Sequence, residues 1–182
     1  GVSQTEALTY QTMSATRIHL TQMEIVRSEP VIKRAVTTLK LDERPFNYEK
    51  NFSSEIKKPF IDYFARKEMV ALDELGPDMR KEAFLNYAIQ ELKNNITTVL
   101  IPHTDIFYIY ATDYDPYKAV EIANVVSRAY TIFDQQQQLA ELSLRYGNLH
   151  PTVMQLQDNI MRMDQNLSGA KLPDLEAIGT VG

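Results

Sequence analysis

Apolar residues recur at helical spacing along most of the chain. In Thr16–Arg27 and again in Pro30–Leu41 they fall three or four positions apart, which is typical of a helix with one buried face. We expect Ser28 to cap the second of these helices and Pro30 to occupy its first turn, which divides the helical region 16–41 in two. The same spacing predicts helices over residues 53–92, interrupted where prolines occur.

Between residues 96 and 112 the pattern becomes that of strands. Ile96–Ile101 and Ile106–Tyr110 are short, rich in β-branched and aromatic residues, and separated by a turn that contains Pro102. We predict a hairpin or an adjacent pair of strands. The second strand is almost wholly apolar or aromatic, so we expect it to be buried on both faces.

A long amphipathic helix is predicted over residues 115–135. Asp115 is suited to its N-cap and Pro116 to its first turn. Its apolar positions follow at spacings of three and four, and they are Ala119, Ile122, Val126, Ala129 and Phe133. We expect this stripe to cover the sheet.

A strict heptad pattern resumes after a run of four glutamines. Its positions alternate in steps of three and four, and they are Leu139, Leu142, Tyr146, Leu149, Val153, Leu156, Ile160, Met163 and Leu167. This seam is typical of a coiled coil. Gly147 and Pro151 lie inside it without changing its register, so we expect a kink near 147–151 in a nearly coaxial helix over 136–167. At 1.5 Å per residue the seam would span about 43 Å, and we expect it to project and pair with either the same chain or a neighbouring subunit.

The predicted fold class is therefore α+β. Residues 1–135 form an α/β base, in which helices pack on a small mixed β-sheet. Residues 136–167 form the long projecting, coiled-coil-like helix, and residues 168–182 are expected to be a loop or a truncated end.

Composition narrows the function classes. The 182-residue chain has a net charge of −5, which argues against a nucleic-acid-binding surface. It has no cysteine, and therefore neither disulfides nor a thiolate nucleophile. We find no apolar stretch of about 18–20 residues and no signal-peptide pattern, and we expect the chain to be a portion of a longer protein.

Motifs for catalysis and metal binding are sparse. The glycines form no phosphate-binding loop, and His19, His103 and His150 are too far apart in sequence for zinc-ligand spacing. Asp113 and Asp115 are the best acid/base or metal candidates, but the roles of Asp115 as a helix cap and of Asp113 in a connecting loop explain them better. We therefore predict no catalytic residue, no cofactor and no metal site.

An ordered set of motifs resembles Wzz-like chain-length determinant proteins, the polysaccharide co-polymerases of bacterial inner membranes. The strand 106–110 is followed by the elements of the family's strand, Asp-Pro, Ala, Ala-Asn, Tyr signature, here Asp115-Pro116, Ala119, Ala123-Asn124 and Tyr130. Leu144-Arg145-Tyr146-Gly147 and His150-Pro151 resemble the Leu-Arg-Tyr-Gly-x-x-His-Pro element of the exopolysaccharide branch, which includes GumC-like exporters and bacterial tyrosine autokinases. The boundary at Ser28 and Pro30 resembles the family's early Ser-x-x-Val helix boundary.

The resemblance implies a periplasmic domain held at the bacterial inner membrane by flanking membrane helices. It implies an α/β base with a helical extension, assembled as a homo-oligomeric ring. Such proteins regulate the chain length of O-antigen (lipopolysaccharide), capsule or exopolysaccharide, or assist export, together with a membrane polysaccharide polymerase or export machinery. The domain itself is not expected to be an enzyme, and the resemblance leaves open a cytoplasmic tyrosine kinase domain in the full-length protein.

Two other hypotheses follow from the residues. The domain could be a binding module that holds polysaccharide or an export partner at its helix tip or in a groove. An enzyme is the third hypothesis, and it depends only on Asp113 and Asp115.

Overall fold

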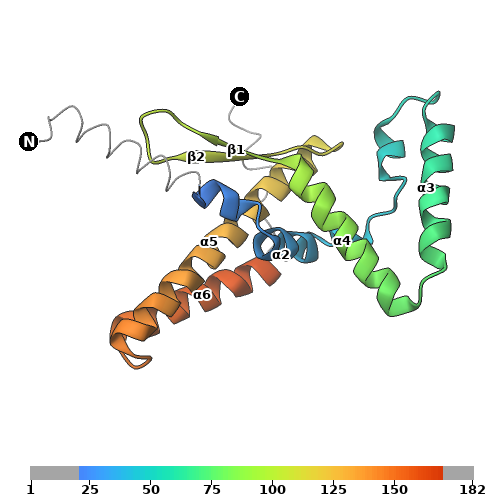
Figure 1. Ribbon diagram of the computed structural model, residues 1–182. Coiled ribbons are helices and arrows are strands. Elements are labelled where there is room, and N and C mark those ends of the chain that lie inside the picture. Colours follow the sequence, from blue (N-terminus) through green and yellow to red (C-terminus); the bar gives the residue numbers. More distant parts are fainter. Residues whose placement is uncertain (1–20, 170–182) are drawn as a thin grey trace, which may run out of the picture.

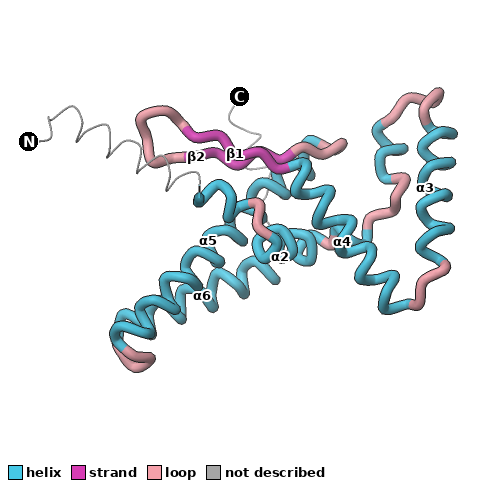
Figure 2. The backbone as a smooth tube through the Cα atoms, viewed as in Figure 1, coloured by secondary structure: helices cyan, strands magenta, loops and turns pink. Residues whose placement is uncertain are grey.

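The computed structural model describes residues 21–169, and it shows a mostly helical α+β chain with a small sheet (Figures 1 and 2). Residues 21–26 are helical. The elements that follow are α2 (Glu29–Leu39), the 3-10 helices η1 (Leu41–Glu43) and η2 (Tyr48–Phe52), α3 (Lys58–Asp73), α4 (Pro77–Asn95), β1 (Ile96–Leu100), β2 (Phe107–Ala111), α5 (Pro116–Tyr146) and α6 (Pro151–Gly169). No helix among these residues is both long and apolar enough to cross a lipid bilayer.

The core is built around the middle of α5. One apolar stripe of this helix is buried, and it comprises Ile122, Val125, Val126, Ala129 and Ile132. The α2 helix supplies the other large buried set, namely Val31, Ile32, Ala35 and Val36. Residues of α4, β1 and α6 join the same cluster. The predicted core-facing role of the 115–135 helix is confirmed.

The predicted hairpin is confirmed, but the prediction of a mixed sheet is wrong, because the sheet of the described residues has two strands that pair only antiparallel. β1 and β2 pair antiparallel, with Ile96 opposite Ala111 and Leu100 opposite Phe107. The prediction that the second strand is buried on both faces is wrong, because Tyr108 and Tyr110 are exposed. The described helices lie along only one side of the hairpin (Figure 1), so alternate β2 side chains face away from them.

The predicted N-cap is confirmed for α5 but not for α2, although both helices have a proline in the first turn. The Oδ1 of Asp115 accepts a hydrogen bond from the Tyr117 N–H at 3.0 Å, and Pro116 opens α5. Ser28 occupies the N-cap position of α2, and Pro30 lies in the first turn, but the Ser28 side chain makes no cap. Its hydroxyl instead donates to the carbonyl of Ile25 at 2.6 Å, because the preceding helix ends there and offers a free acceptor.

Other predicted boundaries move by a few residues. Over the predicted region 53–92, residues 53–57 form a bend and turn, and α3 starts only at Lys58. Pro77 opens α4 as expected. The long helix passes through the glutamine run without a break, so 135 is no element boundary. Of the predicted terminal loop, residues 168 and 169 belong to α6 and the rest lie outside the described residues, as does the first part of the 16–41 region.

The prediction of a kinked, nearly coaxial helix over 136–167 is wrong. α5 ends at Tyr146 with Gly147 as its C-cap, and α6 folds back along α5 as the second arm of a helical hairpin (Figure 1). Gly147 adopts φ 80° and ψ 164°, a conformation that reverses the chain and is almost restricted to glycine. The seam therefore pairs largely within the chain, since Val153, Ile160 and Leu167 are buried.

This turn gives a testable prediction about Gly147. We expect Gly147→Ala to lower the free energy of unfolding by about 1–3 kcal/mol, because a Cβ is strained at this φ and ψ. Gly76→Ala is the matched control, with φ −64° and no atom near the added Cβ, and its effect should stay within about 0.5 kcal/mol. Urea unfolding measures both, and equal effects would contradict a special role for Gly147.

Candidate functional site: the hairpin tip and the Arg44 cavity

The tip of the α5–α6 hairpin carries the Leu-Arg-Tyr-Gly-x-x-His-Pro residues. The Tyr146 and His150 rings lie 4.8 Å apart between centroids. The Nδ1 of His150 accepts a hydrogen bond from the Thr152 N–H at 3.2 Å, so His150 caps α6, which Pro151 opens. His150 thus has a structural role in the turn.

The same tip is apolar and open to solvent. Leu144 is 91% exposed and Leu149 is 87% exposed, although Leu149 belongs to the predicted seam. Tyr146 and Arg145 are also exposed. Among the other seam residues, Leu142, Leu156 and Met163 are half-buried. The tip residues therefore form an exposed apolar surface that is not covered by the packing of α5 against α6.

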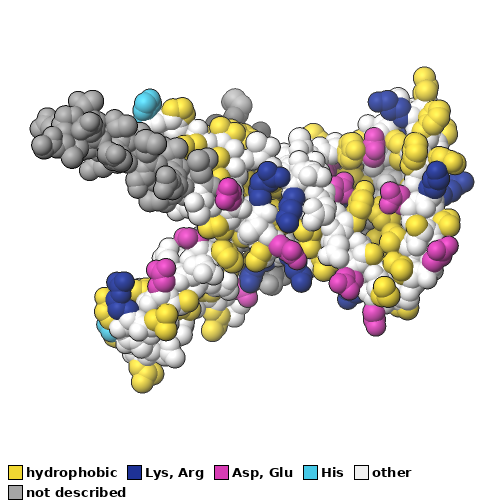
Figure 3. Space-filling view, in the orientation of Figure 1, with side chains coloured by type: hydrophobic (Ala, Val, Ile, Leu, Met, Phe, Trp, Pro, Cys, Tyr) yellow, Lys and Arg dark blue, Asp and Glu magenta, His cyan; other side chains and the backbone are white. Residues whose placement is uncertain are grey.

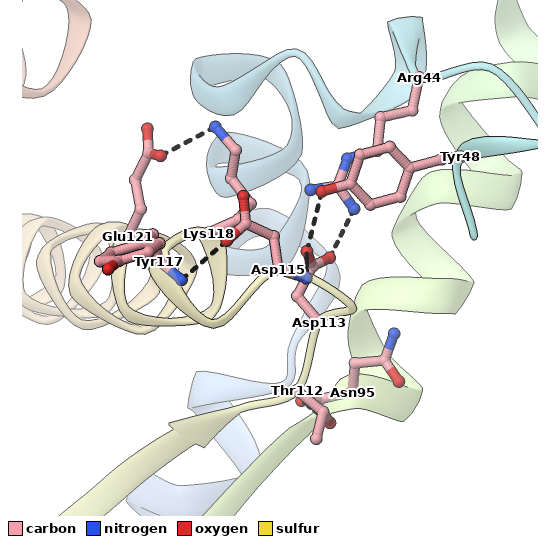
Figure 4. A network of polar contacts seen from close by, with 9 residues as sticks. All are labelled: Arg44, Tyr48, Asn95, Thr112, Asp113, Asp115, Tyr117, Lys118 and Glu121. Carbon is pink, nitrogen blue, oxygen red and sulfur yellow. Dashed lines mark hydrogen bonds and ion pairs between the residues drawn. The ribbon is translucent and has the colours of Figure 1, made fainter. Parts of the chain in front are cut away.

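A polar network joins the start of α5 to the segment before α3 (Figure 4). The Asp113 side chain is 5% exposed, and its Oδ1 accepts from the Arg44 Nη1 at 2.6 Å. Its Oδ2 accepts from the Tyr48 hydroxyl at 3.1 Å and from the Asp115 N–H at 3.0 Å. Burial raises the pKa of Tyr48, an effect that Arg44 opposes and Asp113 reinforces, so the phenol remains a donor at neutral pH.

This geometry bears on the two aspartates singled out from the sequence. Asp113 already accepts hydrogen bonds on both carboxylate oxygens, and Asp115 is the N-cap of α5. Figure 4 shows the two carboxylates directed at different partners. Across residues 21–169, no group of three or more histidines and carboxylates is placed to hold a metal ion. Asp113 thus connects two segments of the fold, and Asp115 caps α5.

An aromatic cavity of about 120 Å³ lies beside this network. Phe46 packs edge-to-face on Tyr87 at 5.1 Å and stacks on Phe84 at 5.3 Å. The further lining residues are Leu41, Asp42, Arg44, Pro45, Tyr48, Glu49, Ala88, Glu91 and Tyr114. The cavity thus combines aromatic faces with both signs of charge, a lining suited to a small polar molecule with flat apolar faces.

Two charged residues determine the electrostatics of this cavity. The Arg44 guanidinium lies 4.0 Å from the centre of the Tyr48 ring, and its Nη2 is buried with no hydrogen-bond partner. Burial raises the pKa of Glu91, which Arg44 lowers and Asp113 raises further. The Arg44 Nη2 is therefore a buried donor group that no acceptor within the described residues satisfies.

The remaining motif residues lie beside the hairpin sheet. Asn124 and Tyr130 line a shallow groove of about 370 Å³ together with β2 residues, and the Tyr130 ring packs on Phe107 at 5.8 Å between centroids. Burial raises the pKa of Tyr130, and Asp134 adds to this. Ala119 is half-buried near the start of α5. The structure therefore separates the motif residues into a tip group and a sheet group.

Sequence reasoning missed Arg44, Tyr48, Tyr87 and Glu91. Arg44 and Tyr48 fall in a stretch that reads only as a polar loop, and they meet Asp113 across a separation of more than sixty residues. The available signal was the density of aromatic residues between positions 46 and 52, which is unusual for a solvent-exposed loop.

The polar network predicts that removal of the Asp113 carboxylate lowers the stability of the fold substantially. Asp113→Ala should lower the free energy of unfolding by about 3 kcal/mol, because it leaves the partly buried Arg44 guanidinium without its partner. Asp158→Ala, which removes an exposed carboxylate of α6, should change it by no more than about 0.5 kcal/mol. Chemical denaturation of both variants checks this, and a similar small loss in each would contradict the structural role of Asp113.

The chain was compared with family models, curated proteins and solved structures. No family model, curated protein or solved structure matches the chain.

Proposed function

We propose that this chain is the periplasmic domain of a bacterial inner-membrane protein that regulates polysaccharide chain length or export as a ring-like oligomeric scaffold. One observation carries the proposal: the Leu-Arg-Tyr-Gly-x-x-His-Pro residues form the exposed, apolar tip of a helical hairpin that extends from an α+β base (Figure 1). The biological role is inferred from the resemblance to Wzz-like polysaccharide co-polymerases, and the hairpin tip is the surface through which we expect the scaffold to make its contacts.

The physical argument concerns Leu144 and Leu149. Both lie at the hairpin end, where neither packs against the core of its own chain. A cluster of exposed large apolar residues is typical of an interaction site, and assembly would remove it from water. In the proposed scaffold the tip contacts a neighbouring subunit or the polymerase or export machinery.

This role needs no chemical step in the domain. A scaffold changes the length of a polymer by controlling how polymerase copies and the growing chain are held together, and affinity between surfaces is sufficient for that. O-antigen, capsule and exopolysaccharide all remain within the proposal.

A substitution at the tip tests the proposal. In the full-length protein, Leu149→Asp should leave the domain folded but weaken assembly about tenfold or more and shift the polysaccharide length distribution, because a charge replaces an exposed apolar contact. The measurements are sedimentation velocity and gel separation of the polysaccharide made by complemented cells.

Two variants at nearby positions serve as controls. Asn148→Asp adds the same charge in the same turn and should preserve both readouts. Leu156→Asp should instead disrupt α5–α6 packing and lower helicity, because Leu156 is half-buried against the core. An unchanged size and an unchanged polymer length in Leu149→Asp would refute the proposed role of the tip.

The aromatic cavity favours a second candidate, a glycan-binding module of an export complex. Sugar rings present flat apolar faces and many hydroxyls, which match the aromatic residues and the charged residues Arg44 and Glu91 that line the cavity. We expect Tyr87→Ala to weaken binding of isolated polysaccharide fragments about tenfold, whereas Tyr117→Ala, an exposed tyrosine outside the cavity, should not. Calorimetric titration that detects no binding to the unaltered protein would exclude this candidate.

A further inference from the structure

The α3 helix presents two contrasting faces. Its inner side is only half-buried against η2 and contributes Ile61, Ala65 and Leu72, and no residue of α3 is fully buried. The outer side carries large apolar residues with more than half of their surface exposed, and these are Phe60, Tyr63, Phe64 and Val70. Figure 3 shows hydrophobic side chains gathered at this end of the molecule.

The exposed residues follow a helical seam. Phe60, Tyr63, Lys67 and Val70 are spaced by three, four and three positions, which places them along one line of the α3 surface. The Lys67 amine lies 5.8 Å from the centre of the Tyr63 ring, so its aliphatic stem extends along the same surface. An outer seam with this spacing is the geometry by which one helix packs on another.

The charges at the ends of α3 are opposite to those that would stabilise the helix alone. Lys57 and Lys58 lie at its N-terminus, and Asp73 and Glu74 lie at its C-terminus. The helix dipole favours acidic residues at the first end and basic residues at the second, and α3 has none of either there. Within the described part of the chain, Lys58 pairs with Glu55, whereas Lys57 and Glu74 form no ion pair.

We propose that the outer face of α3 binds α3 of a second copy of this chain in an antiparallel arrangement. With the two-fold axis at the level of residue 65, Phe60 of one copy lies opposite Val70 of the other, and Tyr63 lies opposite Lys67. The same arrangement brings Lys57 of one copy to Glu74 of the other at both ends. A single symmetric contact thus buries the exposed apolar residues of α3 and pairs the charges at its two ends.

Charge balance favours a second copy over an anionic membrane surface. Between residues 57 and 74 there are four basic and four acidic residues, so the helix has no net attraction to an anionic surface. Separated charges of opposite sign make the face complementary to itself. Antiparallel pairing also places the two helix dipoles in opposite directions, which is the favourable orientation.

This contact deepens the proposed function, on whose oligomeric assembly it rests, by naming one interface of that assembly. Because the contact is symmetric, it joins subunits two at a time. An assembly that uses α3 in every subunit therefore contains an even number of subunits.

Disulfide trapping tests the arrangement directly, because the chain has no cysteine. Phe60→Cys and Val70→Cys should each form little cross-linked dimer alone, since ten residues of helix separate the identical positions by about 15 Å. An equimolar mixture of the two should cross-link readily. Gln90→Cys, an exposed position on α4, gives the background. Equal cross-linking of the mixture and this background would overturn the proposal, as would self-linking of Phe60→Cys at the level of the mixture.

Equilibrium sedimentation of cysteine-free variants provides the second arm. Phe64→Asp should weaken self-association about tenfold or more. Lys57→Glu and Glu74→Lys should each weaken it several-fold, and the double variant should regain the unaltered affinity, because the two charges are exchanged. Failure of this rescue, or flotation with anionic vesicles without self-association, would overturn the proposal.

These measurements are independent of the hairpin-tip experiment. Trapped α3 dimers together with a normal polymer length in Leu149→Asp would support the α3 contact and count against the proposed role of the tip. Loss of assembly in Leu149→Asp without α3 cross-linking would give the opposite result.

Discussion

The structure depends on the burial of one stripe of α5. Ile122, Val126 and Ala129 lie at the centre of a cluster to which α2, α4, β1 and α6 all contribute. Two alanines, Ala35 of α2 and Ala129 of α5, are completely buried, and small residues at such positions let helices approach closely. Since the β-hairpin has only two strands, it gains its order from packing on this helix. The placement of α2, α4, β1 and α6 follows from that contact.

Asp113 adds a polar connection to this apolar one. It lies between β2 and α5, and it binds Arg44, which follows η1, and Tyr48, the first residue of η2. The interaction orients the aromatic residues of the segment 44–48 against α4, where they enclose the cavity. A carboxylate that looks like a catalytic candidate in the sequence therefore links two segments of the fold beside the aromatic cavity.

Function in this chain is best sought on its surfaces. Two exposed apolar regions lie at opposite ends of the molecule, one at the α5–α6 tip and one on α3 (Figures 1 and 3). Both are parts of helices that extend away from the central cluster, where side chains cannot be buried within one copy of the chain. An assembly would cover both, and this geometry is the reason for placing the proposed activity in association and not in a pocket.

Much of the secondary structure was determined by the sequence alone. The Asp115-Pro116 helix start, the hairpin and the buried stripe of α5 are local consequences of capping, β-propensity and periodicity. Tertiary structure decided the direction of α6, because a heptad register is the same in a continuous helix and in two antiparallel arms, and only the backbone at Gly147 distinguishes them. It also decided the face of β2 that is exposed, and it brought Arg44 and Tyr48 to Asp113. These outcomes depend on which distant surfaces meet, and periodicity along the chain contains no information about that.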